Sequence, residues 1–311
     1  MRTVAVIGAS GRQGGAQVRQ LVKAGFAVKA ISRSPDPFYG EQQPDTVTVV
    51  PADLYDEASL IAAFDGADAV FHTHPLRARA DRATIAGSVG RAAKAAGVDR
   101  VVWNTSSWIP DRPGDAHTYV GNTAGLNALF RSGVGATVFG SVLFMDNLLT
   151  NWARPFIVNE GRFVYAHTPE TEANWISLDD VARIMIHSLD RPDMEGAWMN
   201  IGGPERLRPP QLAQSLSDAL GREIRYDACS PAEFGRLLAN AYGDAMSKEE
   251  QDATAAQIGR FYEYNVTAPT RPFEVDVAEM QRRIPLELET FGDWAKRQDW
   301  RNSNAPRPPA G

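Results

Sequence analysis

The chain begins with a short apolar run and a glycine-rich loop, Val4-Ala5-Val6-Ile7-Gly8-Ala9-Ser10-Gly11-Arg12-Gln13-Gly14. The β-branched run predicts a buried strand, and the pattern after Gly14 predicts a helix. Gly8 permits a tight turn, Gly11 lets the backbone approach a pyrophosphate, and Gly14 lets the helix pack closely on the strand. Because a helix N-terminus offers free N–H groups and partial positive charge, this stretch predicts a dinucleotide-binding site.

The rest of the first half repeats the same alternation of strand and helix. The expected strands are Val4–Ile7, Ala27–Ile31, Val47–Val50, Ala69–Phe71, Val101–Trp103 and Thr137–Phe139. The expected helices are Gln13–Ala24, Ser59–Phe64, Thr84–Ala96 and Thr118–Arg131. This pattern predicts an α/β fold, a doubly wound parallel sheet of the Rossmann type with helices on both faces.

Beyond residue 150 the rhythm changes. Further strands are expected at Arg162–Tyr165, Asn174–Ile176 and Ala197–Ile201, with a helix over Leu178–Leu189 and mainly helical sequence from Pro209 onward. We therefore predict a nucleotide-binding domain over residues 1–152, with a return segment at about 174–203. Residues 153–173 and 204–311 would form a smaller, mainly helical substrate-binding domain, with a cleft between the two.

Composition limits the classes of function. The chain has 311 residues with a formal net charge of -6, which argues against nucleic acid as the main partner. The single cysteine, Cys229, excludes a disulfide within the chain, so a reduced cytoplasmic setting is expected. The longest mostly apolar stretch, Ala136–Met145, is far below the roughly 20 residues of a membrane span. We expect a monomer or homodimer that acts on a small molecule away from the membrane.

The end of the second expected strand indicates which cofactor is bound. It reads Ile31-Ser32-Arg33-Ser34, without the acidic residue that accepts hydrogen bonds from the ribose 2′-hydroxyl of NAD. A guanidinium can instead pair with a 2′-phosphate, and Arg12 is within reach of the same group. We therefore predict NADP(H), with the alternative that Arg33 is only a solvated residue at the start of a loop.

From these residues onward the chain resembles the NmrA-like, atypical short-chain dehydrogenase/reductase family over most of its length. The segments that carry the resemblance are the Gly8–Gly14 loop, Arg33, Pro51–Leu54, Phe71–Pro75, Phe144–Asn147, Trp175–Ala182 and Asn200–Glu205.

The resemblance implies roles for single positions. Asp53 would meet the adenine edge with Leu54 beside it, although Asp53 is also a common turn residue. The nicotinamide side would be lined by Thr73, His74 and Pro75, and the cleft bordered by Phe144, Met145 and Asn147. Phe144 and Met145 are equally compatible with a core position. The cofactor-binding residues that we expect are Gly8, Ser10, Gly11, Arg12, Gln13, Gly14, Arg33, Asp53, Leu54, Thr73, His74, Pro75 and Asn122.

No metal site is expected. His72 and His74 stand close together, but no carboxylate or cysteine is near them in the sequence, and the other histidines are scattered.

The catalytic residues are harder to predict, because the Tyr-x-x-x-Lys pair of short-chain dehydrogenases is missing. NmrA-like relatives commonly keep the lysine, and its position falls on Asn122 here. An amide can hydrogen-bond a ribose hydroxyl or a substrate carbonyl but brings no charge. The candidates for stabilising a developing oxyanion are Asn122, Tyr119 and Ser106, although Ser106 also fits a plain loop role.

Seven tryptophans suggest the kind of substrate. Trp103, Trp108, Trp152 and Trp175 lie in segments that should approach the cleft, and we expect Trp108 and Trp175 to contact substrate. A cleft lined this way suits a flat aromatic or quinone-like compound. The alternative is that the tryptophans pack in the core.

Together these features predict an NADPH-dependent reductase of a small aromatic, quinone-like or conjugated carbonyl compound. Two alternatives stay open: a non-catalytic redox sensor that binds NADP(H) and reports it to a protein partner, and a cofactor-assisted isomerase or cyclase.

Overall fold

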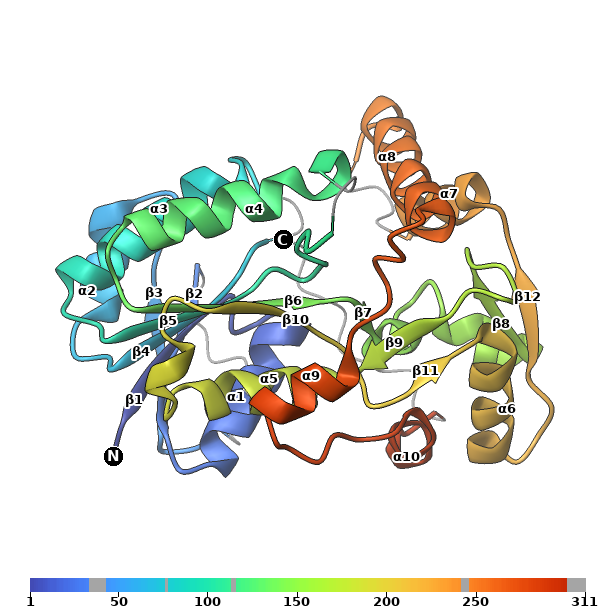
Figure 1. Cartoon of the computed structure of the whole chain (residues 1–311), viewed down its shortest axis with the longest axis horizontal. Helices are drawn as coiled ribbons and strands as arrows, with labels where there is room; N and C mark the ends of the chain where they lie inside the picture. Colours follow the sequence, from blue (N-terminus) through green and yellow to red (C-terminus); the bar gives the residue numbers. More distant parts are fainter. Residues whose placement is uncertain (34–42, 76–77, 113–115, 242–245, 301–311) are drawn as a thin grey trace.

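The computed structural model describes residues 1–33, 43–75, 78–112, 116–241 and 246–300. A seven-stranded sheet in the order β10-β6-β5-β4-β1-β2-β3 forms its centre (Figure 1). The strands are β1 (Thr3–Ile7), β2 (Ala27–Ser32), β3 (Val47–Pro51), β4 (Ala69–Thr73), β5 (Arg100–Asn104), β6 (Ala136–Ser141) and β10 (Trp198–Ile201). Every neighbouring pair runs parallel. The predicted doubly wound parallel sheet is confirmed.

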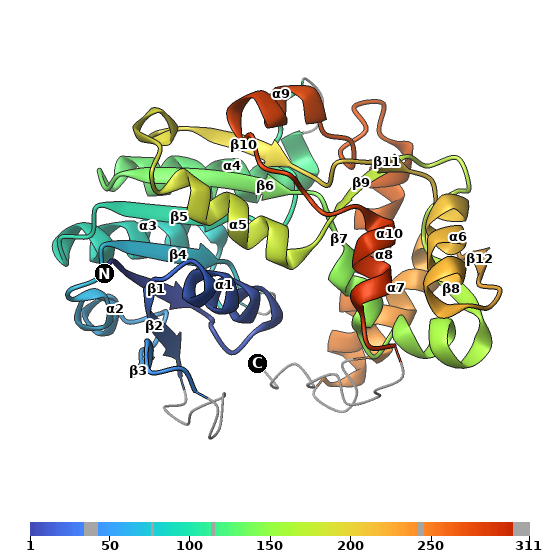
Figure 2. The same cartoon turned by 90° about the horizontal axis from the view of Figure 1, so that it is seen from below.

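Helices cover both faces of this sheet. On one face lie α2 (Glu57–Phe64), α3 (Arg82–Ala95) and α4 (Ala116–Arg131). On the other, α1 (Arg12–Lys23) packs beside α5 (Leu178–Ser188), as Figure 2 shows. Helix α3 begins earlier than the sequence pattern predicted, because the Asp81 side chain accepts a hydrogen bond from the Thr84 N–H and caps it.

The strands bury both of their faces. In β1, Val4 and Val6 belong to the apolar core under α1 and α5, whereas Ala5 and Ile7 belong to the core under α2 and α3. A parallel sheet covered on both sides needs such unbroken apolar strands, which explains why the Val4–Ile7 run is the clearest strand signal in the sequence.

The C-terminal half adds two small sheets and a group of helices. The three-stranded sheet has the order β11-β9-β7, and β12 pairs with β8. These strands are β7 (Leu143–Phe144), β8 (Arg162–Tyr165), β9 (Ala173–Ile176), β11 (Arg206–Leu207) and β12 (Arg225–Ala228). The helices are η2 (Met145–Leu149), η3 (Phe156–Glu160), η4 (Pro192–Met194), α6 (Pro209–Leu220), α7 (Pro231–Asn240), α8 (Lys248–Thr267), α9 (Val277–Arg283) and α10 (Phe291–Arg297).

This half has an apolar core of its own, rich in aromatic side chains such as Phe163, Tyr165 and Phe234. The return segment contributes β10 to the large sheet and α5 to the helices beside α1, while β9 belongs to the three-stranded sheet. Residues 301–311 of the predicted second domain lie outside the described residues. The division into two domains stays a prediction.

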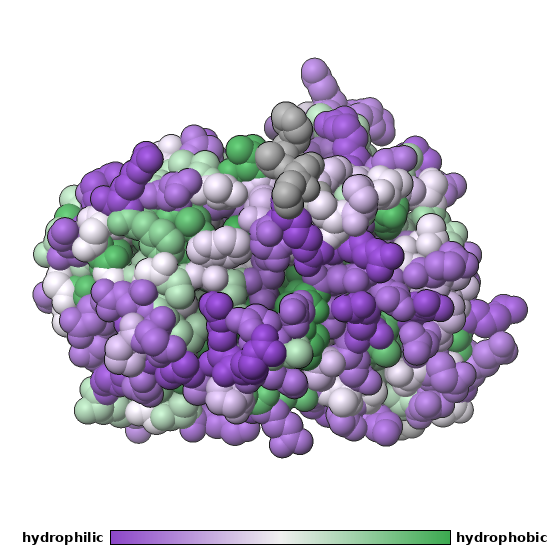
Figure 3. All heavy atoms as spheres, in the orientation of Figure 1, coloured by the Kyte–Doolittle hydropathy of each residue, from purple (hydrophilic) through white to green (hydrophobic). Residues whose placement is uncertain are grey.

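Hydrophilic residues cover most of the face drawn in Figure 3. Among the helices that the structure describes, none combines the length and the apolar character needed to cross a bilayer.

Candidate functional site

The candidate site lies at the carboxyl edge of the large sheet. Because the strands are parallel, the segments that follow β1, β4 and β5 all leave the sheet at this edge, where ligands of open α/β sheets bind. Hydrogen bonds connect these segments through α1: Gln17 Nε2 donates to Thr73 Oγ1 at 3.2 Å, and Gln13 Nε2 donates to Ser106 Oγ at 2.9 Å. Residues predicted from three separate stretches of sequence thus meet beside α1.

The glycine loop has the geometry that a pyrophosphate requires. Gly8 has φ +70°, which L side chains rarely adopt, and a Cβ on Gly14 would lie 2.2 Å from the Gly8 carbonyl oxygen. The N-cap residue of helix α1 is Gly11, which provides no side-chain cap, and the first turn has no acidic residue. A helix N-terminus of this kind favours an anionic ligand.

The charged residues on the side predicted to bind adenosine are exposed. Arg33 is exposed and forms no ion pair with any residue that the structure describes. Arg12 is also exposed, and its Nη1 donates to the Asp146 carbonyl oxygen at 2.9 Å. The Asp53 carboxylate accepts from the Tyr55 N–H at 3.0 Å and so forms a turn, with Leu54 half-buried beside it. Contacts of these residues with adenosine stay predictions.

Ser106 follows β5 in a strained conformation. Its φ of 60° lies in the left-handed region, where residues other than glycine are uncommon. The completely buried Asn104 holds it: Asn104 Oδ1 accepts from the Ser106 N–H at 3.1 Å, and Asn104 Nδ2 donates to Gln13 Oε1 at 2.8 Å. Gln13 in turn bonds the Ser106 hydroxyl.

His72 at the end of β4 and His74 just after it are neutral at pH 7. Burial, followed by the charge of Arg82, lowers the pKa of His74 to about 4. Burial lowers the pKa of the completely buried His72 to about 3. Arg82 Nη1 donates to the Thr105 carbonyl oxygen at 3.3 Å, and burial lowers the pKa of its guanidinium. At neutral pH, Arg82 is therefore charged while His72 and His74 are neutral. Pro75, which follows His74, is half-buried.

Tyr119 and Asn122 are both buried, with 3% and 2% of their surface exposed. Asn122 Nδ2 donates at 2.8 Å to the Trp108 carbonyl oxygen and at 2.8 Å to Ser107 Oγ. The Tyr119 hydroxyl donates to Asn265 Oδ1 in α8. Both side chains therefore attach α4 to its neighbours, and their contact with cofactor or substrate stays a prediction.

The residues predicted to contact substrate divide into two groups. Trp108, Met145 and Trp175 expose 1%, 1% and 2% of their surface and fill the core. Phe144 and Asn147 are half-buried. In this conformation only Phe144 and Asn147 of the five have surface with which to meet a ligand.

Comparison with known proteins identifies the family of this chain. The family model of the NmrA-like family matches residues 1–254. The chain belongs to the NmrA-like family. An NAD(P)H azoreductase from Xenophilus azovorans is 30% identical over 251 residues, which cover 79% of this chain and 85% of that protein.

Solved structures share the fold of this NmrA-like chain. An NADPH-dependent quinone oxidoreductase from Escherichia coli, complexed with NADPH, has a TM-score of 0.70 at 21% identity and covers 94% of this chain and 98% of its own. NmrA itself, a negative transcriptional regulator in complex with NAD, has a TM-score of 0.73 at 19% identity over 96% and 98% of the two chains.

Three residues of this edge were missed by sequence reasoning. Asn104 is a polar residue directly after the apolar strand Val101–Trp103, a signal that could have been used. Gln17 stands one helical turn after Gln13 on α1, and its burial could have been expected from that spacing. Arg82 gave no signal, because only the fold brings it to the Thr105 carbonyl.

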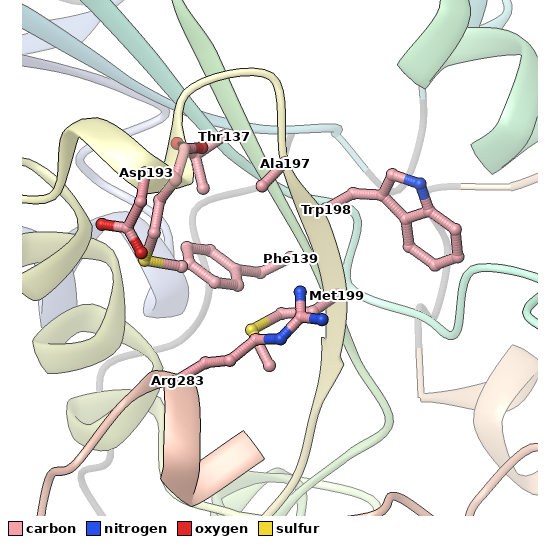
Figure 4. A pocket seen from close by; sticks show the side chains of 8 residues that line it. Thr137, Phe139, Asp193, Ala197, Trp198, Met199 and Arg283 are labelled. Atoms are coloured by element: carbon pink, nitrogen blue, oxygen red, sulfur yellow. Dashed lines mark hydrogen bonds between the residues drawn. The ribbon is translucent and has the colours of Figure 1, made fainter. Parts of the chain in front are cut away.

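Two cavities of this NmrA-like chain lie elsewhere. One, of about 230 Å³, is lined by Phe139, Met199 and Arg283 between β6, β10 and α9 (Figure 4). β6, β5 and β4 separate β10 from β1, so this cavity is remote from the glycine loop in the sheet order. The other, an open hollow of about 820 Å³, is lined by charged residues including Arg206 and Glu274. We place the candidate site at the carboxyl edge because the groups able to do chemistry gather there.

The described residues contain no group of three or more histidine, cysteine or acidic side chains that could hold a metal ion.

Proposed function

We propose that this chain is an NADPH-dependent reductase of a small aromatic, quinone-like or conjugated carbonyl compound, in which Ser106 donates a hydrogen bond to the substrate oxygen. The observation that carries the proposal is the strained backbone of Ser106, with φ 60°. Its hydroxyl is hydrogen-bonded to Gln13 in the first turn of α1. A left-handed non-glycine residue costs of order 1 kcal/mol or more and persists where the surrounding structure holds it, which is common at functional sites.

The cofactor would bind along the carboxyl edge. The Gly8–Gly14 loop and the N–H groups of α1 would hold the pyrophosphate, and Arg33 would pair with the 2′-phosphate. When bound, NADPH supplies a hydride to the substrate. The named activity of the NAD(P)H azoreductase relative and the NADPH complex of the structurally similar quinone oxidoreductase support this assignment.

The chain's own contribution would be to position the substrate and stabilise charge on its oxygen. A carbonyl or quinone oxygen becomes negative as it is reduced, and a fixed hydroxyl donor in a partly dry site stabilises that charge. Ser106 is half-buried and rigidly held, which suits it to this role. Asn122 and Tyr119 would hold α4 and the segment after β5 in place, since both already bond to protein partners.

The test is NADPH consumption by Ser106→Ala across a panel of quinones and conjugated carbonyls. We expect kcat to fall about 100-fold while the Kd for NADPH, measured by fluorescence titration, stays unchanged. Ser107→Ala is the matched control. The Ser107 hydroxyl accepts from Asn122, so its loss should cost much less. A Ser106→Ala protein with the kcat of the unmodified chain would remove Ser106 from the mechanism.

A second candidate is a regulatory protein that binds NADP(H) without turning it over. It is favoured by the internal hydrogen bonds of Asn122 and Tyr119, which leave Ser106 as the main donor at the site. The fold similarity to a negative transcriptional regulator in complex with NAD is compatible with it. NADPH that binds tightly yet remains unconsumed with every compound of the panel would favour this candidate.

A further inference from the structure

We infer that Asn104 and Gln13 form an amide relay that fixes the direction of the Ser106 hydroxyl, so that its proton points to a ligand. The relay comprises four side chains at the ends of β5 and β6 and the start of α1, namely Gln13, Asn104, Ser106 and Ser141. The inference rests on the proposed function, because the ligand atom that receives the proton is the substrate oxygen. Asn104 and Gln13 would act as positioning residues.

The direction of the relay follows from one backbone group. The Ser106 N–H can only donate, and it lies 3.1 Å from the Asn104 side chain, so the atom facing it must be the carbonyl oxygen Oδ1. The reverse assignment would place an NH₂ against an N–H. Ser141 Oγ also donates to Oδ1, at 2.7 Å, which completes the acceptor side of this amide.

The next amide is then fixed as well. With Oδ1 facing Ser106, the Asn104 NH₂ points at Gln13 at 2.8 Å, so the Gln13 atom that faces it must be the acceptor Oε1. The Gln13 NH₂ consequently points at the Ser106 hydroxyl, 2.9 Å away. Asn104 and Ser141 have no exposed surface, so water does not compete for the hydrogen bond between them.

The consequence concerns the Ser106 proton. An NH₂ group donates and does not accept, so the Ser106 oxygen receives a hydrogen bond from Gln13 and cannot return its own proton there. No other residue that the structure describes accepts a hydrogen bond from this hydroxyl. The proton is therefore left for a ligand, and the Gln13 bond polarises the hydroxyl toward stronger donation.

The first test reverses the relay with an isosteric change. In Asn104→Asp, the carboxylate still accepts from the Ser106 N–H and from Ser141 but cannot donate to Gln13. The Gln13 amide should then turn over, offer its oxygen to Ser106 and capture the proton. We expect kcat with a quinone at saturating NADPH to fall at least 10-fold. The double variant Asn104→Asp, Gln13→Leu lacks the Gln13 oxygen that would accept the Ser106 proton. Its kcat should be at least 5-fold higher than that of Asn104→Asp.

A second variant covers the case in which a buried aspartate prevents folding. In Gln13→Glu, at a half-exposed position in the first turn of α1, a carboxylate accepts from Asn104 and also from the Ser106 hydroxyl. We expect kcat to fall about 10-fold or more at neutral pH. It should recover in acid, where the protonated carboxyl donates again. Loss of packing alone would give no such recovery.

The outcomes separate the relay from the proposed function. If Ser106→Ala loses activity while Gln13→Glu and any folded Asn104→Asp keep kcat within about 3-fold, the relay is wrong and the Ser106 donor stands. If the reversed variants lose activity but neither the double variant nor acid restores it, the relay is also overturned. If Ser106→Ala itself keeps full activity, the donor assignment fails, and with it the relay's purpose.

Discussion

At the scale of single residues, the proposed chemistry depends on the direction of hydrogen bonds rather than on the presence of charge. Ser106, Asn104 and Gln13 are all neutral, and the two nearby histidines are kept neutral by burial. Neutral groups cost less to desolvate than ions do, so they can be buried at a sheet edge. Arg82 is the exception, and its guanidinium reaches only a carbonyl oxygen within the described residues.

The predicted cofactor preference depends on one residue. Arg33 is exposed at the end of β2, with no acid beside it to receive a ribose hydroxyl. Arg33→Asp would replace attraction to a 2′-phosphate by repulsion, so we expect NADPH affinity to fall about 100-fold and NADH affinity to change by less than about 2-fold. Fluorescence titration with both cofactors measures this.

Arg33→Lys is the graded control, because it keeps the positive charge but loses the two parallel hydrogen bonds of a guanidinium. Its NADPH affinity should lie between those of the unmodified chain and Arg33→Asp. Equal affinities of the unmodified chain for NADPH and NADH would contradict the role of Arg33.

At the scale of elements, the contact between α1 and the end of β1 sets the shape of the glycine loop. A methyl group on Gly14 would lie 2.2 Å from the Gly8 carbonyl oxygen and 2.8 Å from the Ala9 Cα. These are backbone atoms, which cannot move aside without shifting the helix. The close approach therefore requires glycine at position 14, as the sequence motif predicts.

We expect Gly14→Ala to displace α1, lower stability by about 1–3 kcal/mol and weaken NADPH binding at least 10-fold. Its matched control is the neighbouring Gly15→Ala. There the nearest atoms are the Arg19 side chain at 3.6 Å and the Ala9 oxygen at 3.7 Å, which are ordinary contacts. Since alanine favours helix, this variant should be neutral or more stable by up to about 1 kcal/mol. Thermal melts and cofactor titration compare the two, and equal behaviour would argue against the close approach.

At the scale of the whole molecule, the sequence predicted the elements of the large sheet well, because buried parallel strands such as Val4–Ile7 leave an unmistakable apolar pattern. The glycine loop was also predictable, because its glycines are required by the local backbone conformation and by close helix–strand packing. Helix α3 begins two residues before the predicted Thr84, because the side chain of Asp81 caps it.

The site was less predictable, because it depends on contacts between distant segments. Gln13 and Ser106 are separated by 93 positions, and no local pattern indicates that they bond. The burial of the tryptophans was also hard to predict. Trp108 and Trp175 were expected to line an aromatic cleft, yet the fold places both in the core. A tryptophan that lines a cleft and one that fills a core look alike in a single sequence.

The proposed function requires the protein to consume NADPH with a conjugated oxygen acceptor. The most direct measurement is loss of the reduced nicotinamide absorbance when the unmodified protein is mixed with NADPH and each compound of a quinone and conjugated-carbonyl panel. Cofactor binding is followed in parallel by tryptophan fluorescence. We predict turnover with at least one quinone at a rate proportional to protein concentration, and faster with NADPH than with NADH. Bound NADPH that stays reduced with every compound would contradict the claim.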